Sequence, residues 1–253
     1  MSSFGTSLFL FSAGVLGGAM NAAAGGGSFV TLPALVYAGL PTPAASASGT
    51  VALFPGRLAS AWVYRTDLGA FASRVSLRAM AAASAAGGVA GALVLLRIKP
   101  AHFDAAVPWL LLGATLAFAG GPQLSAALRR TERVPAWVLL AGQFVLCAYA
   151  GLFGGAAGIL TMAFWSLAGL TDVKAMNAAK AVLLGVANAA SVALFASAGA
   201  VRWALAAWVL AGAVLGGYAG ARLTQRVTAG QLRVGLSAFN VAVTGAFFVR
   251  AGL

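Results

Sequence analysis

Apolar stretches long enough to cross a lipid bilayer recur along the whole length of this chain. A membrane-spanning helix needs about 20 apolar residues, and candidate spans lie at 4–24, 44–64, 78–96, 105–122, 136–153, 175–197, 203–221 and 233–250. Of the 253 residues, 61% are hydrophobic and 8% are charged, whereas a soluble domain carries about 25% charged residues. The sequence therefore predicts an all-α, polytopic membrane helix bundle, with residues 1–253 in a single transmembrane domain.

Two shorter apolar segments, 26–40 and 155–170, each follow a cluster of glycines. Six glycines make up the two clusters: Gly25, Gly26 and Gly27, then Gly154, Gly155 and Gly158. Short segments interrupted by glycine at corresponding positions of two halves indicate a transporter binding site. We expect Gly-broken helices here, and whether they span the membrane or are re-entrant stays open.

The two halves of the chain match when one is shifted along the other. A shift of 130 residues places Gly25 on Gly155 and Thr50 on Lys180, and further matches follow in the same order. The predicted organisation is a first repeat at 4–122, a cytoplasmic linker at 123–135 and a second repeat at 136–250. Each repeat holds five segments, an odd number, so the second copy would enter from the opposite side as an inverted repeat.

Positive charge is distributed unevenly between the connections. If every segment crosses in turn, ten Lys and Arg residues fall on one side of the membrane and four on the other. Cytoplasmic loops carry the excess of Lys and Arg, so we expect a protein of the cell inner membrane with both termini outside. The same rule accounts for the net charge of +12. No basic stretch is long or aromatic-interleaved enough to indicate nucleic acid binding.

Cys147 and His102 are the only cysteine and the only histidine. One residue of each type cannot build a disulfide framework or a metal site. No metal or other cofactor is expected. An enzyme is not expected either, because a membrane-embedded active site would need a nucleophile beside a base, or a set of metal ligands.

Two cations fall inside apolar segments and cannot be assigned to loops. Arg57 lies thirteen residues into the 44–64 segment, and Lys180 lies near the start of 175–197. A charge at the middle of a span costs at least about 2.5–3.5 kcal/mol and by default marks a functional site, although Lys180 could instead snorkel to the interface. The four acidic residues all lie in connections or near segment ends: Asp67, Asp104, Glu132 and Asp172. Because no carboxylate lies deep in a span, a small anionic substrate would neutralise the two cations.

Polar residues share a helical face with each cation, at about 100° per residue. The shared faces hold Asn177, Asn188 and Ser191 beside Lys180, and Ser46, Thr50 and Tyr64 beside Arg57. Polar stripes of this kind face a bundle interior or a wet cavity. The alternative, that the Asn and Ser residues only hydrogen bond one helix to another, stays open.

The glycine clusters supply a second reason to expect an anion. Where a helix restarts after a break, its first amides are unpaired and its dipole is positive, which favours a bound anion. Asn21 and Ser28 flank the first cluster, and they join the six glycines in the candidate binding site. The alternative is close helix packing through small residues, which a chain rich in Gly and Ala also favours.

These stretches resemble the TauE/SafE family of membrane permeases. In the first half the resemblance runs from Gly14 to Arg65, through the glycine triplet and the Gly-Leu-Pro spacing, and in the second half from Gly151 to Trp203. The run from Asn177 to Lys180 looks like one common branch of that family. The resemblance implies a small sulfur-containing anion such as sulfite, sulfoacetate or another sulfonate as the substrate. Arg57 matches no recognised family feature, so its role depends on the membrane argument alone.

The function expected from the sequence is secondary transport that exports small anions by alternating access, with the substrate and the lipid bilayer as partners. An inside-negative potential supplies about 2.3 kcal/mol per charge per 100 mV, so an anion leaves downhill without a coupling ion. The alternatives are an anion channel, an importer of another small metabolite and, from a different class, a non-transporting membrane assembly protein. The oligomeric state stays open, a homodimer included.

Overall fold

The computed structural model describes residues 3–64, 68, 75–127, 134–170, 172–224 and 229–252, which form ten α-helices and no strand. The helices are α1 (Ser3–Ala24), α2 (Ser28–Tyr37), α3 (Thr42–Tyr64), α4 (Leu77–Arg97), α5 (Pro100–Ala127), α6 (Ala136–Leu152), α7 (Ala157–Leu167), α8 (Val173–Ser197), α9 (Trp203–Thr224) and α10 (Ala229–Ala251). Five segments of the described chain are long and apolar enough to cross a membrane: Phe4–Ala22, Leu77–Arg97, Lys174–Ser197, Trp203–Gly220 and Val234–Ala251. The predicted all-α polytopic bundle is confirmed.

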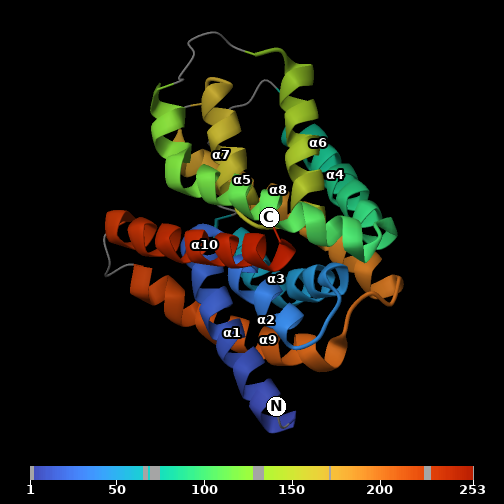
Figure 1. Cartoon of the computed structure of the whole chain (residues 1–253). Helices are drawn as coiled ribbons and strands as arrows, with labels where there is room; N and C mark the ends of the chain where they lie inside the picture. Colours follow the sequence, from blue (N-terminus) through green and yellow to red (C-terminus); the bar gives the residue numbers. More distant parts are fainter. Residues whose placement is uncertain are drawn as a thin grey trace.

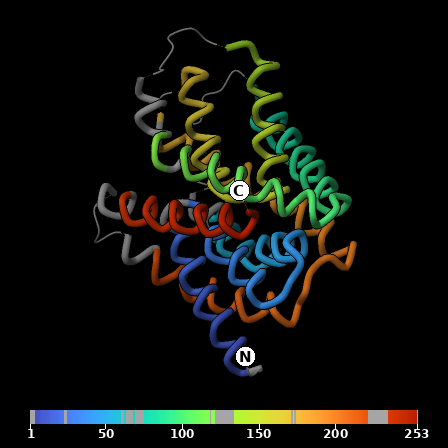
Figure 2. The backbone as a smooth tube through the Cα atoms, in the orientation of Figure 1, coloured from blue at the N-terminus to red at the C-terminus, as the bar shows by residue number. Residues whose placement is uncertain are grey.

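The helices form two lobes with a pair of helices crossing between them (Figure 1). We define the first lobe as α1, α2, α3 and α9, and the second lobe as α4, α6, α7 and α8. The most extensive contacts join α1 to α9 in the first lobe and α4 to α6 in the second. The crossing pair is α5 and α10, which pack on each other (Figure 2). Direct contact between the lobes is made mainly by α3 and α8.

The contacts repeat when each helix is exchanged for the one five places away along the chain. In the first lobe α9 packs on α1 and α3, and in the second lobe α4 packs on α6 and α8. The fourth helix of each half therefore packs on the other half. This pattern supports the predicted repeats, whereas their inverted threading and the boundaries 4–122 and 136–250 stay predictions. Part of the predicted linker 123–135 lies outside the described residues.

Small residues allow the backbones of these helix pairs to approach closely, as in many membrane proteins. Four glycine contacts carry the packing: Gly87 on Phe144, Gly91 on Ala148, Gly216 on Val15 and Gly220 on Ala19. Adding 129 to the numbers of Gly87 and Gly91 gives Gly216 and Gly220. Subtracting 129 from the numbers of their partners, Phe144 and Ala148, gives Val15 and Ala19. The α4–α6 and α9–α1 interfaces therefore share one packing register.

A hydrogen bond between two threonines joins α5 to α10. Thr115 Oγ1 lies 2.9 Å from Thr244 Oγ1, and both side chains are buried. The two threonines are also 129 residues apart, so they would occupy equivalent positions of the predicted repeats. Equivalent residues meet where a two-fold axis passes. The axis relating the two halves would therefore run through this contact.

We expect cysteines at these two positions to form a disulfide on oxidation. A Thr115→Cys/Thr244→Cys variant, made in a Cys147→Ala background, places two thiols where two hydroxyl oxygens already touch, within reach of a disulfide. Mass spectrometry of a digest should recover the cross-linked peptides. Thr115→Cys with Gly235→Cys is the control, because Gly235 lies about two and a half turns away along α10. Equal cross-linking of both pairs would contradict this packing of α5 on α10.

Candidate functional site

Each half of the chain ends a long helix at a glycine with a left-handed backbone. α1 ends at Ala24, and Gly25 follows with φ +75° and donates its amide to the Asn21 carbonyl at 2.9 Å. α6 ends at Leu152, and Gly154 has φ +77°. Glycine adopts this conformation without the steric cost that a Cβ atom brings. The glycine clusters thus separate α1 from α2 and α6 from α7, as the sequence predicts.

The left-handed glycines change the alignment of the two breaks by one residue. The shift of 130 pairs Gly25 with Gly155, whereas the shared conformation pairs Gly25 with Gly154, 129 positions later. Beyond the short helices, Gly39 (φ +95°) and Gly169 (φ +87°) are 130 positions apart. The two short helices have 10 residues in α2 and 11 in α7. The second short helix therefore holds one extra residue.

The start of α7 presents a run of backbone amides without acceptors. Ala156 has a left-handed backbone, with φ 56°, and α7 begins at the next residue. The first amides of α7 to find an acceptor are those of Ile159 and Leu160, both on the Ala156 carbonyl. The amides of residues 155–158 have no acceptor in the described part of the chain. Such unpaired amides, at the positive end of the helix dipole, favour a bound anion.

Arg57 joins the two lobes at this second break. It projects from α3 of the first lobe, and its Nη2 donates a hydrogen bond to the Gly154 carbonyl at 3.3 Å. Ser28, the first residue of α2, is buried, and its Oγ lies 3.3 Å from the point where a Cβ on Gly154 would stand. The two helix breaks therefore meet across the lobes, beside the Arg57 guanidinium.

Lys180 approaches the same segment from α8. Its Cδ lies 3.3 Å from the point where a Cβ on Gly158 would stand, so a larger residue at 158 would crowd the lysine stem. Its Nζ donates to Asn177 Oδ1 at 2.6 Å. Both cations thus lie against residues 154–158. The acceptors that they use, a backbone carbonyl and a side-chain amide, carry no charge.

The carboxylates of the described chain hydrogen bond elsewhere. Asp104 is exposed and accepts a hydrogen bond from Thr42 Oγ1. Asp172 is exposed and caps α8 by accepting from the Ala175 amide at 3.0 Å. Asp67 and Glu132 lie outside the described residues. The expected separation of acids from the two cations therefore holds for Asp104 and Asp172.

The family of this chain follows from its similarity to known proteins. A family model described as "Sulfite exporter TauE/SafE" matches residues 10–247. The chain belongs to the TauE/SafE family. The resemblance read from the glycine clusters and their spacing is thereby confirmed.

Curated relatives of this TauE/SafE protein are named as membrane transporters. A "Probable membrane transporter protein" of Haemophilus influenzae is 32% identical over 221 residues, which cover 85% of this chain and 83% of the relative. YfcA of Escherichia coli K12, also a "Probable membrane transporter protein", is 32% identical over 219 residues, 85% of this chain and 79% of YfcA. A Sinorhizobium relative with the same description, ORF9, is 29% identical over 218 residues, 85% of this chain and 81% of the relative. No solved structure matches. The family and these names indicate a membrane transporter and not an enzyme.

Two serines of the predicted polar stripes hydrogen bond one helix to another in this TauE/SafE protein. Ser46 of α3 donates to the Leu152 carbonyl at the end of α6, at 3.1 Å. Ser191 of α8 donates to the Gly88 carbonyl of α4 at 3.0 Å. For Ser46 and Ser191 the structure thus shows the alternative considered for the stripes, in which polar side chains hydrogen bond one helix to another. The Ser46 hydrogen bond nevertheless lies beside the second break, because its acceptor Leu152 is the last residue of α6. The side chain of Tyr64 lies outside the described residues.

The residues of the first break pack beside Arg57. Asn21 Cβ lies 3.0 Å from the Cβ position of Gly27, and Asn21 Nδ2 lies 3.9 Å from that of Gly56, the residue before Arg57. Gly26 lies against Met20: the Met20 Cε is 3.9 Å from the point where a Cβ on Gly26 would stand. Asn21, at the end of α1, therefore lies near the α3 backbone from which Arg57 projects.

Three buried polar side chains of the candidate region form no hydrogen bond with either cation in the described structure. Asn188 donates to the Leu184 carbonyl at 2.7 Å within α8, and its Oδ1 has no partner among the described residues. Thr50 is buried in α3. Thr31 of α2 was not anticipated, because one threonine in an apolar run gives no distinctive signal. Its Oγ1 is buried without a partner in the described structure and lies 3.1 Å from the Cβ position of Gly49.

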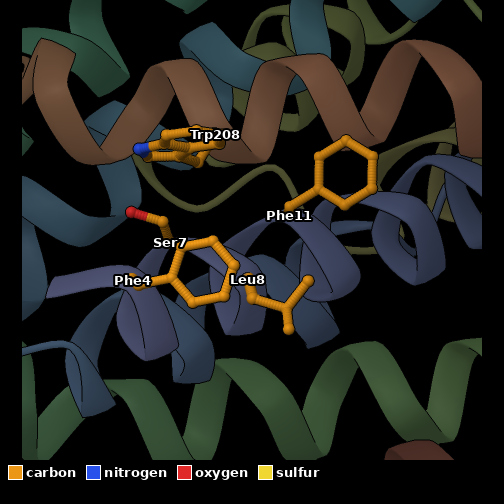
Figure 3. Close-up of a pocket in the computed structure, with 5 residues that line it drawn as sticks. All are labelled: Phe4, Ser7, Leu8, Phe11 and Trp208. Atoms are coloured by element: carbon orange, nitrogen blue, oxygen red, sulfur yellow. The ribbon is translucent and has the colours of Figure 1, made fainter. Parts of the chain in front are cut away.

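An open groove of about 460 Å³ lies away from the two cations, between α1 and α9. Phe4, Ser7, Leu8 and Phe11 of α1 line it together with Trp208 of α9 (Figure 3). Aromatic and aliphatic side chains dominate this lining, and none of the five residues is charged. The groove therefore offers an anion no neutralising partner, unlike the segment 154–158.

Proposed function

We propose that this TauE/SafE protein is a secondary transporter that exports small anions, such as sulfite or organosulfonates including sulfoacetate, by alternating access. The observation that carries the proposal is the position of Arg57 and Lys180. Both lie against residues 154–158, where the amides of 155–158 lack acceptors in the described part of the chain, and both have uncharged hydrogen-bond partners. A cation inside a membrane protein needs a partner, and an anionic substrate provides one.

The substrate class follows from the kind of donors at this site. An oxyanion accepts several hydrogen bonds at once, and guanidinium, ammonium and backbone amide groups are its strongest donors in proteins. The buried Ser28 hydroxyl adds a further donor beside Gly154. Sulfite and the sulfonate group each offer three oxygens to such a set. The name of the matching family, Sulfite exporter TauE/SafE, supports the same class of substrate.

Alternating access is supported by the place of the site between the lobes. Arg57 comes from the first lobe, whereas Lys180 and residues 154–158 belong to the second. A movement of one lobe against the other would separate Arg57 from Gly154 and change the side from which the anion is reached. Transporters built from inverted repeats work around a central site in this way.

Export is the direction that the electrical potential favours. An inside-negative membrane supplies about 2.3 kcal/mol per charge per 100 mV, which corresponds to roughly a fiftyfold concentration ratio for a monovalent anion. The excess of Lys and Arg in the connections of one side supports a place in the inner membrane with both termini outside.

We expect the potential alone to drive net efflux. Proteoliposomes with equal sulfite inside and outside should release sulfite when a potassium diffusion potential makes the interior negative, and collapse of the potential should stop the release. Protein-free liposomes control for leakage. Efflux that persists unchanged after the collapse would contradict potential-driven export.

Uptake of labelled sulfite should also saturate and should be accelerated by unlabelled sulfite on the opposite side, whereas a channel would show neither property.

A further inference from the structure

We propose that the anion site selects small anions with two negative charges over anions of the same size with one. This inference rests on the proposed function and narrows its substrate class. It follows from the way in which two cations, contributed by the two lobes, approach one five-residue segment of the chain.

The geometry brings two separate positive charges to residues 154–158, the break before α7 and the start of that helix. Arg57 reaches residue 154, where it donates to the backbone carbonyl at 3.3 Å. Lys180 lies along residue 158, four residues further along the chain, with its Cδ 3.3 Å from that residue's Cβ position. The unpaired amides of 155–158 lie between these two contacts. An anion held by these amides would therefore have a cation on either side.

Among the described residues, the charges around this segment do not cancel. Arg57 and Lys180 carry like charges, which repel when they are brought to one segment, and their hydrogen bonds end on the neutral oxygens of Gly154 and Asn177. Of the acidic residues that the structure describes, Asp104 and Asp172 are exposed and accept hydrogen bonds from Thr42 Oγ1 and from the Ala175 amide, not from either cation. A monovalent anion would leave one positive charge uncompensated in a partly buried site, whereas a divalent anion would compensate both.

The two cations also come from different lobes, which links charge to conformation. Arg57 is carried by α3 and Lys180 by α8. A divalent anion can bind both cations at once and so offset the repulsion between the lobes. A monovalent anion can fully compensate only one of them. We therefore expect the second charge to increase both the affinity and the stabilisation of the occupied state.

Three C2 sulfonates test the inference because they differ in charge far more than in size. At neutral pH sulfoacetate carries two negative charges, isethionate carries one, and taurine has no net charge. Thermal unfolding of the purified protein is followed against increasing concentrations of each, since a ligand that binds only the folded state raises the melting temperature. We expect sulfoacetate to bind roughly ten- to a hundredfold more tightly than isethionate, from one additional charged hydrogen bond, and taurine to bind most weakly.

Removing the charge of Lys180 tests whether the preference for sulfoacetate comes from its second charge or from its shape. In Lys180→Gln the preference for sulfoacetate over isethionate should fall to within about threefold, because one positive charge remains. Arg97→Gln, which removes an exposed cation from the last turn of α4, should keep the full preference. If Lys180→Gln does not fold, Lys180→Met serves the same purpose.

The outcomes also distinguish this inference from the proposed function. Equal stabilisation by sulfoacetate and isethionate would overturn the divalent preference and leave anion export in place. An unchanged preference in the Lys180 variant would overturn it as well. No stabilisation by any of these sulfonates or by sulfite would overturn the proposed function, and this inference with it.

Discussion

Replacing Arg57 with glutamine should weaken anion binding by more than an order of magnitude while the protein still folds. Arg57 contributes one of the two charges beside residues 154–158 and is the side chain that reaches from the first lobe to the second, at Gly154. Losing one partner of a partly buried charge pair costs about 2–5 kcal/mol. We therefore expect a loss of affinity of at least about thirtyfold for sulfite and sulfoacetate. The measurement is the ligand-induced rise in melting temperature, followed by efflux from proteoliposomes.

Two further variants show whether the charge of Arg57 or its shape is needed. Arg57→Lys keeps the charge but loses the planar donor group, so it should retain weak binding, between the glutamine variant and the natural protein. Arg97→Gln is the matched control, because it removes the same charge from an exposed helix end. A full anion response in Arg57→Gln would remove this residue from the site.

The fold could be predicted from the sequence in its elements but not in its arrangement. Apolar stretches locate the membrane-spanning part of each helix, so the predicted 175–197 agrees with α8, Val173–Ser197. The predicted 105–122 is shorter than α5, Pro100–Ala127, because a helix can continue into polar residues beyond the apolar core. The exchange of α4 and α9 between the lobes had no sequence signal, since small residues such as Gly91 pack equally well on many partners.

The candidate site could be predicted in part from the cost of burying charge. Arg57 and Lys180 were identified because a cation inside a span is expensive, and the structure places both against residues 154–158. The Gly154 carbonyl as acceptor could not be predicted, because every residue carries the same backbone group. Helical faces placed Ser191 in a polar stripe, but a face cannot show whether its neighbour is a substrate or, as here, the carbonyl of Gly88.

The paired glycine interfaces indicate where the fold is most sensitive. A Cβ atom on Gly91 would overlap the carbonyl of Ala148 in α6 and lie 2.8 Å from the Leu152 amide nitrogen. Backbone cannot rotate away as a side chain can, so α4 and α6 would have to separate along their shared length. Overpacking of this kind costs about 1–3 kcal/mol and sometimes more. The same segment of α6 leads into the break at Gly154, so a shift of α6 would also displace the amides that the anion requires.

Gly91→Ala should therefore lower the melting temperature by about 5–10 °C, the shift that roughly 3 kcal/mol produces in a protein of this size. Size-exclusion chromatography of heated, detergent-solubilised protein measures the loss of the folded species. Gly113→Ala is the matched control: Gly113 also lies within a helix, α5, but its Cβ position has no atom within 4 Å. There alanine should leave stability unchanged or raise it by up to about 1 kcal/mol, through its higher helix propensity. Equal melting temperatures for the two variants would contradict close packing of α4 on α6 and the two-lobe arrangement on which the anion site depends.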